Sequence, residues 1–166
     1  ALMQMDFVTA IFTLAKEAGV HTALDTSGSP FRDTPDYLER FDQLMAVTDL
    51  FILDIKEMDS EKHQALTGHK NENILKLAQY LSDHGKAMWI RHVLVPGLTD
   101  DEAGLQDLAD FLKTLKTVER TEILPYHTLG MFKWENLGID YPLKDVMTPT
   151  KVEVAKAEAI LGIEHK

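Results

Sequence analysis

The sequence has 166 residues, of which 45% are hydrophobic and 27% are charged, a composition typical of a globular domain with one sizeable core. Its formal net charge of −10 at pH 7 repels phosphate backbones and anionic lipid, so neither nucleic acid nor a membrane is an expected partner. The absence of cysteine excludes disulfides, thiolate metal sites and cysteine nucleophiles within this chain. We expect residues 1–166 to form a single domain.

The first half of the chain alternates helical and extended patterns. Thr34 followed by Pro35 is a typical N-cap and first position of a helix. A polar stretch, residues 57–70, ends this half without a predicted element. The first helix has one apolar face, which carries Phe7, Ile11, Leu14 and Ala18. The predicted ranges are helix Asp6–Ala18, strand Val20–Leu24, helix Pro35–Met45 and strand Leu50–Ile55.

The second half continues the alternation and contains two capping patterns. Residues 99–102, Thr-Asp-Asp-Glu, have the form of a capping box with Thr99 as N-cap. Thr148 before Pro149 predicts the start of the last helix, after an irregular region over residues 128–148. The predicted ranges are helix Asn73–His84, strand Ala87–Val95, a helix from the capping box to Leu115, strand Val118–Leu124 and a helix from Pro149 to about Leu161.

The repeated strand–helix unit has crossovers long enough for parallel pairing of the strands. The sequence therefore predicts an α/β fold with about four parallel strands and outer helices. An open doubly wound sheet and part of a (βα) barrel both fit this pattern. The chain contains neither G-x-G-x-x-G nor G-x-x-x-x-G-K-S/T, so the usual nucleotide-binding motifs of doubly wound folds are not supported.

Each predicted strand supplies an ionisable residue at or near its C-terminal half. Asp25 ends the first strand, and alternation places Asp54 and Lys56 with Ile52 on one side of the second. Arg91 lies within the apolar third strand. His127 follows the fourth, after Pro-Tyr. Active sites of α/β barrels and open α/β sheets lie at the carboxyl ends of the strands, so we interpret these residues as a candidate site.

Each of these residues also has a purely structural interpretation. Asp25 before Thr-Ser-Gly is suited to an Asx turn. Asp54 and Lys56 share a face and could form an internal ion pair, and Arg91 could pair with an acidic side chain for stability. His127 alone is typical of a loop histidine. In the site interpretation, the two aspartates share a cation or a positive ligand group, while Lys56 and Arg91 hold carboxylates.

The other histidines and the methionines give weaker signals. His92 has the opposite parity from Arg91, so we expect it to face the helices rather than the site. The histidines expected on the surface are His63, His69, His84 and His165. The methionines expected to fill the core are Met3, Met5, Met45 and Met88.

Four segments in a fixed order resemble a known family. They are Asp25–Gly28, Asp49–Lys56, Trp89–Gly97 and Leu124–Gly130, and Lys133-Trp134 and the last helix extend the likeness. Together they are similar to the pyruvate formate-lyase activating enzymes, which are radical S-adenosylmethionine (SAM) enzymes. The resemblance covers essentially the whole chain. It implies a partial (βα)₆ barrel like an incomplete TIM barrel.

The resemblance also implies an activity and its cofactors. In the family, a 4Fe–4S cluster on a C-x-x-x-C-x-x-C loop holds SAM, and reductive cleavage of SAM gives a 5′-deoxyadenosyl radical that takes a hydrogen atom from a glycine of pyruvate formate-lyase. Flavodoxin or ferredoxin is the expected electron donor, the location is cytoplasmic, and the role belongs to anaerobic glucose metabolism. We expect the cysteine loop and a G-G-E motif to lie upstream of Ala1, so that this chain alone is inactive.

The resemblance assigns roles to residues of this sequence. Asp54, Ile55, Lys56 and His127 match SAM-binding positions. Asp25, Thr26, Asp54 and the carbonyl of Ile52 match a monovalent-cation site beside the SAM carboxylate. Arg91 matches an arginine that contacts the glycine-loop peptide or SAM, and Ser27 replaces an asparagine often found there.

Two alternatives remain open at this point. One is activation of another glycyl-radical enzyme, and the other is a non-catalytic α/β binding domain whose strand-end charges are structural. With only four strands, an open barrel exposes apolar surface, through which we expect the chain to dimerise or pack.

Overall fold

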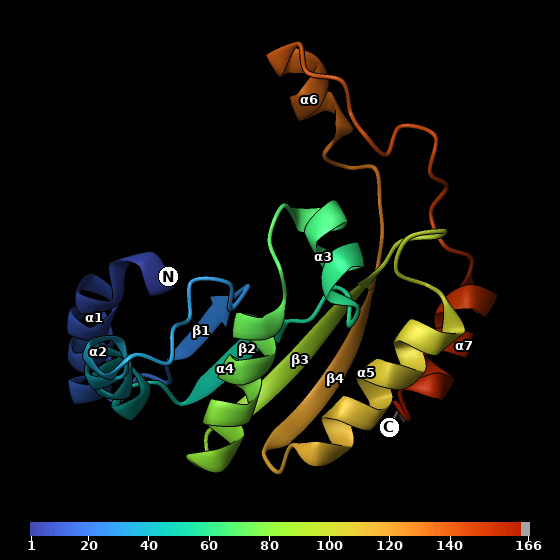
Figure 1. The fold of residues 1–166 in the computed structure, drawn as a ribbon. Helices are drawn as coiled ribbons and strands as arrows, with labels where there is room; N and C mark the ends of the chain where they lie inside the picture. Colours follow the sequence, from blue (N-terminus) through green and yellow to red (C-terminus); the bar gives the residue numbers. More distant parts are fainter. Residues whose placement is uncertain (164–166) are drawn as a thin grey trace.

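The computed structural model describes residues 1–163, in which four parallel strands form one sheet (Figure 1). The strands are β1 (Ala23–Thr26), β2 (Leu50–Asp54), β3 (Ala87–Leu94) and β4 (Val118–Pro125). The helices are the 3-10 helix η1 (Leu2–Gln4), α1 (Met5–Glu17), α2 (Pro35–Ala46), α3 (Ser60–Thr67), α4 (Glu72–Asp83), α5 (Glu102–Thr114), α6 (Met131–Leu137) and α7 (Lys151–Ile160). The predicted α/β class and the four parallel strands are confirmed.

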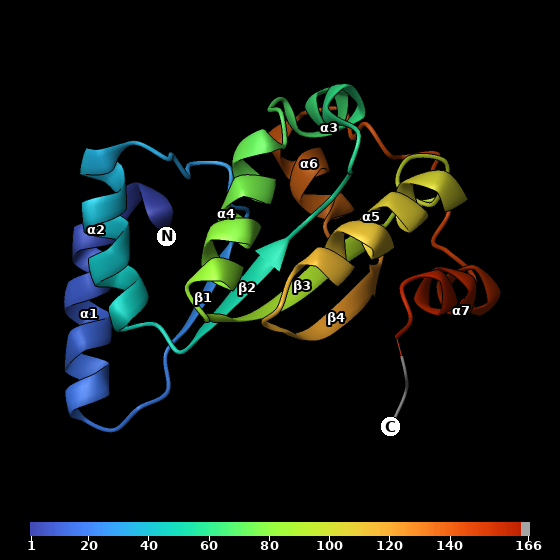
Figure 2. The same cartoon turned by 60° about the horizontal axis from the view of Figure 1, so that its bottom comes forward.

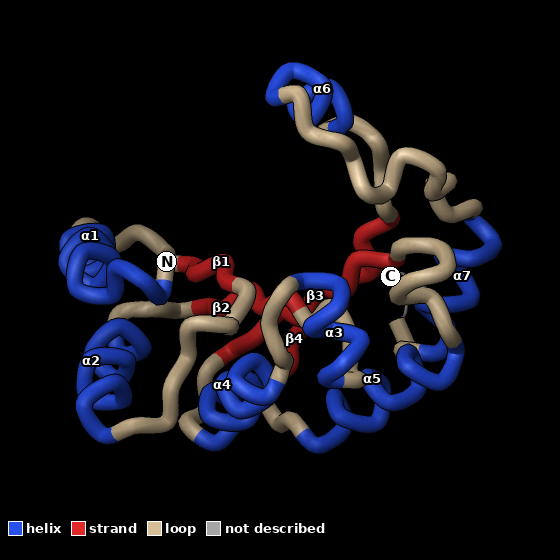
Figure 3. Tube along the Cα trace, turned by 45° about the horizontal axis from the view of Figure 1, so that its top comes forward, coloured by secondary structure: helices blue, strands red, loops and turns tan. Residues whose placement is uncertain are grey.

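The strand order resolves the choice between the two architectures that fit the sequence. The strands lie in the sheet in chain order, β1-β2-β3-β4, without the reversal that defines a doubly wound sheet. Helices α2, α4 and α5 lie along one side of the curved row of strands (Figures 2 and 3). The sheet is therefore part of a (βα) barrel, with its other face turned to what would be the barrel interior.

The hydrophobic core lies between the sheet and these helices. Every second residue of the central strands is completely or almost completely buried there, and helices contribute the opposing layer. The core includes Phe51, Leu53 and Ile55 from the β2 segment, Met88 and Ile90 from β3, Phe41 and Leu44 from α2, Leu77 and Leu81 from α4 and Leu108 from α5. The alternate residues of the same strands face the uncovered side, which is where the ionisable residues lie.

The face of α1 that was predicted to be apolar points to solvent. Phe7 and Leu14 are 63% and 66% exposed, and Met3 is exposed as well, so its expected place in the core was wrong. The buried contacts come from Leu2 and Met5 instead. The physical reason is that α1 packs beside α2 at the β1 edge of the sheet, so a second apolar face has no neighbour among the described residues. The other three predicted core methionines are buried.

The polar stretch after β2 contains a helix that the sequence analysis missed. The side chain of Asp59 caps α3 by accepting a hydrogen bond from the Lys62 N–H (2.8 Å), and Gly68 ends the helix at a φ of 82°. The helix is short and largely polar, so it lacks the apolar periodicity that reveals longer helices. The irregular region after β4 likewise contains α6.

The predicted N-caps Thr99 and Thr148 do not cap their helices. The Thr99 hydroxyl donates to the Val93 carbonyl (2.6 Å) and accepts from the Val95 N–H, while Asp101 caps α5. Thr150, not Thr148, caps α7 and forms a capping box with Glu153. In both places the sequence offers two candidate caps a few residues apart, and the path of the preceding loop decides between them. The first strand also begins at Ala23 rather than Val20.

The chain between β4 and α7 extends away from the sheet and carries α6 at its far end (Figure 1). The Tyr126 and Tyr141 hydroxyls are 2.9 Å apart, and the Trp134 ring lies 5.4 Å from that of Tyr141. The first contact joins the outgoing and returning arms of the extension, and the second joins α6 to the returning arm. No helix among residues 1–163 combines the length and apolar character needed to cross a bilayer.

Gly28, just after β1, is expected to be intolerant of a side chain. Its φ is 71°, and a Cβ would lie 2.9 Å from Leu53 Cδ1. We expect Gly28→Ala to lower the free energy of unfolding by about 2–4 kcal/mol, since backbone strain and overpacking add. Gly85→Ala is the matched control, because its φ is 68° but no atom lies within 4 Å of the added Cβ. Urea denaturation should show a loss of about 1 kcal/mol for the control, and equal losses would contradict the packing argument.

The exposed face of α1 is expected to drive self-association. We expect the chain to show concentration-dependent association in sedimentation velocity, and the double variant Phe7→Lys/Leu14→Lys to abolish it without loss of helix content. Lysine reduces the net negative charge, so greater repulsion could not explain the loss. The double variant Met147→Lys/Val152→Lys, at similarly exposed apolar positions near the other end of the chain, is the control. A wild-type chain that stays monomeric at all concentrations would refute this expectation.

Candidate functional site

The candidate site is a cluster of four charged residues at the carboxyl ends of β1, β2 and β3. We call Asp25, Asp54, Lys56 and Arg91 the strand-end cluster. The sheet register pairs Asp25 with Ile52 and Asp54 with Arg91, so β1 and β2 end close to the level of Arg91, whereas β3 continues to Leu94. All four residues belong to the strand positions that alternate with the buried core positions. Parallel pairing and strand alternation together bring these residues to the uncovered face.

Arg91 is the centre of the cluster because it bridges both carboxylates. Its Nη2 lies 2.6 Å from Asp25 Oδ1, and its Nε lies 3.1 Å from Asp54 Oδ1. Lys56 Nζ lies 3.2 Å from Asp54 Oδ2. Partial burial opposes the charge on Arg91, but its hydrogen bonds and Coulomb interactions with the two aspartates raise its pKa above the ordinary value. The cluster is therefore neutral overall, with two positive and two negative side chains.

The structural alternatives for these residues are partly confirmed. Asp54 does form the expected ion pair with Lys56, and Arg91 does pair with acidic side chains. The turn after β1 is formed differently from the prediction, because the Thr26 hydroxyl, not Asp25, accepts a hydrogen bond from the Gly28 N–H (3.1 Å). The Asp25 carboxylate instead pairs with Arg91. Its side chain is 58% exposed, against 19% for Asp54, so Asp25 is the more accessible of the two carboxylates.

A pocket of ≈ 180 Å³ opens where β2 meets α3. Asp54 and Lys56 form one wall of it. The other lining residues are Ser27, Ser29, His63, Thr67, His69 and Ile74. The volume is below the roughly 300 Å³ of a site for a drug-sized ligand, so the pocket suits one polar group of a larger ligand rather than the whole.

His63 lines this pocket and was wrongly expected on the surface. It is 2% exposed, and its Nδ1 lies 2.6 Å from the carbonyl oxygen of His69. A carbonyl only accepts, so Nδ1 donates, and Nε2 is left buried without a partner among the described residues. The Thr67 hydroxyl lies 3.1 Å from the same Nδ1. The i, i+4 spacing of His63 and Thr67 before Gly68 is the sequence signal that could have revealed a helix end holding an inward histidine.

The uncovered face continues onto β4 with residues that the sequence analysis also missed. Arg120 stacks over Trp89, with 5.0 Å between the guanidinium carbon and the ring centroid. Arg120 also pairs with Glu122 at 2.5 Å, and Glu122 lies in register with Arg91. Residues 120 and 122 alternate along β4 as Trp89 and Arg91 do along β3, and they pair with these residues beyond the bulge at Glu119 in β4. These contacts extend the charged face from β1 to β4.

His127 and Ile55, two of the predicted ligand-binding positions, differ from the cluster in their surroundings. His127 is exposed beyond β4, and no hydrogen bond or ion pair within residues 1–163 joins it to the cluster. The Ile55 side chain is buried among the helices, and its backbone N–H donates to the Arg91 carbonyl (3.0 Å). Only the backbone of Ile55 is therefore close to the site. The binding roles of both residues stay predictions.

The arrangement is suited to binding rather than to acid–base catalysis. Opposite charges placed side by side fit a zwitterionic ligand, since each charge of the ligand finds a partner of the opposite sign. Both oxygens of Asp54 already accept hydrogen bonds, one from Lys56 and one from Arg91. No group of three or more His, Asp or Glu residues within 1–163 is placed to hold a metal, and a thiolate-bound cluster finds no cysteine in this chain. An iron–sulfur cluster therefore does not fit the residues present.

Comparison with known proteins gives consistent results. A sequence profile of the radical SAM superfamily matches residues 1–112. The pyruvate formate-lyase-activating enzyme of Streptococcus mutans is 57% identical over 164 residues, which are 99% of this chain and 62% of that protein. The enzyme of the same name from Listeria monocytogenes is 47% identical over 96% of this chain and 64% of its own length. The chain thus spans less than two thirds of these relatives.

Solved structures show the same fold. A domain of a pyruvate-formate lyase-activating enzyme from Bacteroides vulgatus has a TM-score of 0.78 at 27% identity, over 97% of this chain and 87% of that one. The coproporphyrinogen III oxidase HemN of Escherichia coli, a radical SAM enzyme, has a TM-score of 0.64 at 16% identity over 96% of this chain and 37% of that one, a likeness of fold alone. The superfamily profile covers more than half of the residues, and the chain belongs to the radical SAM superfamily.

Proposed function

We propose that this chain is the SAM-binding C-terminal part of a pyruvate formate-lyase-activating enzyme. The observation that carries the proposal is the strand-end cluster on the uncovered face of a partial barrel, together with 57% identity over nearly the whole chain to an enzyme of that name. Bound SAM supplies the hydrogen-abstracting group that converts a glycine of pyruvate formate-lyase into a glycyl radical. The iron–sulfur cluster that reduces SAM needs cysteines from outside this chain.

The role of the chain's own residues in this proposal is to hold and orient SAM. The amino-acid end of SAM is a zwitterion, and its sulfonium adds a further positive charge. Lys56 is a partner for the carboxylate, and Asp54 for an ammonium or a hydroxyl group. His127 and the Ile55 backbone complete the proposed SAM contacts. The buried, unpaired Nε2 of His63 supports a polar ligand in the adjoining pocket, because a buried polar atom without a hydrogen-bond partner is unfavourable.

The proposal includes a monovalent cation held by Asp25, Thr26, Asp54 and the carbonyl of Ile52. Arg91 already neutralises both aspartates, so the cation would have to displace its guanidinium from at least one of them. Asp25 is the more exposed partner and the easier one to release. Arg91 would then be free to contact the SAM carboxylate or the glycine-loop peptide. Cation binding would therefore release the Arg91 guanidinium from an aspartate and allow it to bind a ligand.

The remaining elements of the proposal concern the whole enzyme. Its partners are the glycine loop of pyruvate formate-lyase and an electron donor such as flavodoxin or ferredoxin, in the cytoplasm. The names of the relatives support these elements. The relatives are also longer than the part that this chain matches. The charged face lies open on the side that faces the barrel interior, where a peptide loop could approach it.

The coding sequence that precedes Ala1 tests the proposal most directly. We expect it to encode C-x-x-x-C-x-x-C followed by G-G-E in the same reading frame. The full-length protein, with its cluster reconstituted, should then generate a glycyl radical on pyruvate formate-lyase in the presence of SAM, as measured by EPR. Parallel assays with other glycyl-radical enzymes distinguish the substrate. An in-frame stop codon without a cysteine motif, or a signal only on another enzyme, would overturn the assignment.

The two ends of β2 offer a matched pair of substitutions for SAM binding. We expect Asp54→Ala to weaken SAM binding roughly tenfold, because a hydrogen bond to a charged group contributes about 1.5 kcal/mol or more. Asp49→Asn is the control. Lys16 and Thr22 hold the pKa of Asp49 well below its usual range, but Asp49 precedes β2 at the far end from the cluster. Titration of the chain with SAM, followed by NMR, should show unchanged affinity for the control. If wild type and Asp54→Ala bind SAM with equal affinity, the strand-end cluster has a structural role and does not bind SAM.

A further inference from the structure

His92 connects two loops at the carboxyl end of the sheet, on the side opposite Arg91. It is 4% exposed and faces the helices, as its parity in β3 predicts. Its Nδ1 lies 2.9 Å from the carbonyl oxygen of Ile55, just after β2. Its Nε2 lies 2.9 Å from the carbonyl oxygen of Thr99, in the loop before α5. One ring thus spans the segments that follow two neighbouring strands.

The identity of the two partners determines the protonation of the ring. Both are backbone carbonyl oxygens, which accept hydrogen bonds and cannot donate them. A neutral imidazole carries a proton on only one nitrogen, so it can satisfy only one of the two contacts. Both contacts at 2.9 Å are hydrogen bonds only if both nitrogens carry protons. The geometry therefore points to the imidazolium form of His92.

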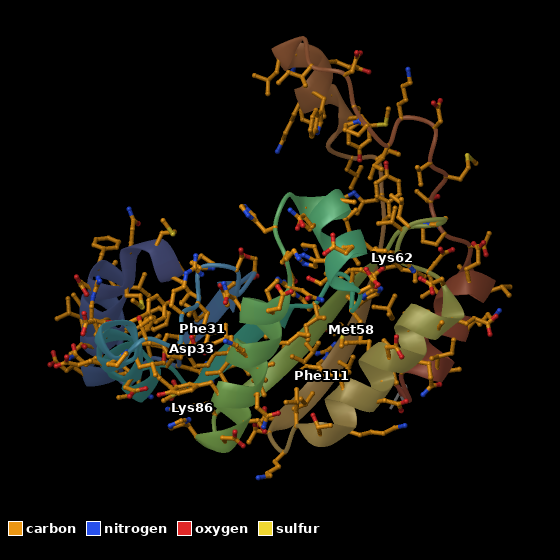
Figure 4. All side chains as sticks on the ribbon, viewed as in Figure 1. Phe31, Asp33, Met58, Lys62, Lys86 and Phe111 are labelled. Carbon is orange, nitrogen blue, oxygen red and sulfur yellow. The ribbon has the colours of Figure 1, made fainter. Side chains whose placement is uncertain are left out.

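Two acidic side chains lie in the surroundings of His92. Glu57 is buried, and its Oε1 accepts hydrogen bonds from the Met58 and Asp59 N–H groups at 2.8 and 3.0 Å. Glu57, Asp101 and His92 line the same cavity of ≈ 10 Å³, which is about the size of one water molecule. Lys62, labelled with Met58 in Figure 4, pairs with Asp101 at 3.4 Å from the α3 side. On β3 itself, Arg91 pairs with aspartates on the opposite face.

The contact with His92 fixes the backbone between two residues of the strand-end cluster. Ile55 lies between Asp54 and Lys56, its N–H donates to the Arg91 carbonyl (3.0 Å), and its carbonyl accepts from His92. The peptide units on both sides of Ile55 are thereby tied to β3. We propose that His92, as an imidazolium, is a positioning residue that holds the Asp54–Lys56 segment in place. The contacts stand on their own, whereas their consequence for SAM rests on the proposed function.

The ring nitrogens of His92 can be observed directly. In a long-range ¹H–¹⁵N correlation spectrum of the chain at neutral pH, both His92 nitrogens should resonate at the protonated position. His84 is the internal reference, because among residues 1–163 only its Nδ1 has a backbone partner, the Tyr80 carbonyl at 2.8 Å. The signals are assigned by their loss in a His92→Asn variant. An unprotonated resonance from either His92 nitrogen would overturn the proposal.

Two conservative variants separate the two hydrogen bonds. The amide nitrogen of asparagine reaches the place of Nδ1, so His92→Asn keeps a donor for Ile55, while His92→Gln keeps one for Thr99. We expect hydrogen exchange at the Ile55 and Met58 amides to stay near the wild-type rate in His92→Asn and to rise roughly tenfold in His92→Gln. The Leu77 amide in α4 reports global stability in both variants. Equal rates in the two variants would show a merely structural histidine.

SAM titrations of the same variants distinguish failure of this inference from failure of the proposed function. If the wild type binds SAM, His92→Gln should bind it roughly tenfold more weakly and His92→Asn with nearly unchanged affinity, as for other residues that orient a ligand-binding group. Equal weakening in both variants would count against positioning by the Ile55 contact. If no variant, including the wild type, binds SAM, the proposed function fails, and the ring spectrum and hydrogen exchange still decide the role of His92.

Discussion

The burial of one face of the parallel sheet beneath α2, α4 and α5 is the constraint on which the rest of the structure depends. Alternation along a strand sends every second side chain to the opposite face, so a strand such as β2 can bury Phe51 and Leu53 and still present Ile52 and Asp54 on the other side. A shift of the pairing by one residue would reverse both sets. The apolar contacts therefore hold the charged side chains on the uncovered face.

The strand-end cluster illustrates how a protein can keep ionisable groups partly out of water. Arg91 is shared by two carboxylates and Lys56 binds the second one, so each charge has a partner at hydrogen-bonding distance. The same arrangement gives the site its selectivity, because a ligand must offer charges that replace those partners. A zwitterion does this, whereas a simple anion or cation satisfies only half of the cluster. The superfamily to which the chain belongs uses SAM, a ligand of this kind.

Histidines of this chain have roles that their sequence surroundings do not show. His63 was expected on the surface but lies buried at the pocket beside Asp54, with one ring nitrogen unpaired. His92 was expected to face the helices and does so, but its two carbonyl partners come from loops that the sequence separates by more than 40 residues. The first lies within the proposed site and the second lies behind it. Both histidines lie next to the segment at the carboxyl end of β2.

The sequence by itself determined the α/β class, the number of parallel strands and the position of Asp25 and Asp54 at the carboxyl ends of their strands. Local periodicity and strand parity are properties of a few consecutive residues, and they survive without knowledge of the rest. The resemblance to the activating enzymes likewise depends on short segments of consecutive residues. The short polar helix α3 and the correct choice between neighbouring caps were missed, since their local signals are weak or duplicated.

Only the tertiary structure decided which partners the charged and buried groups have. It placed Arg91 between two aspartates from different strands, turned the apolar face of α1 to solvent, and brought His63 into the interior. It also distinguished a partial barrel from a doubly wound sheet by the order of the strands. The physical reason is the same in each case. These features depend on contacts between residues far apart in the chain, which local sequence patterns do not specify.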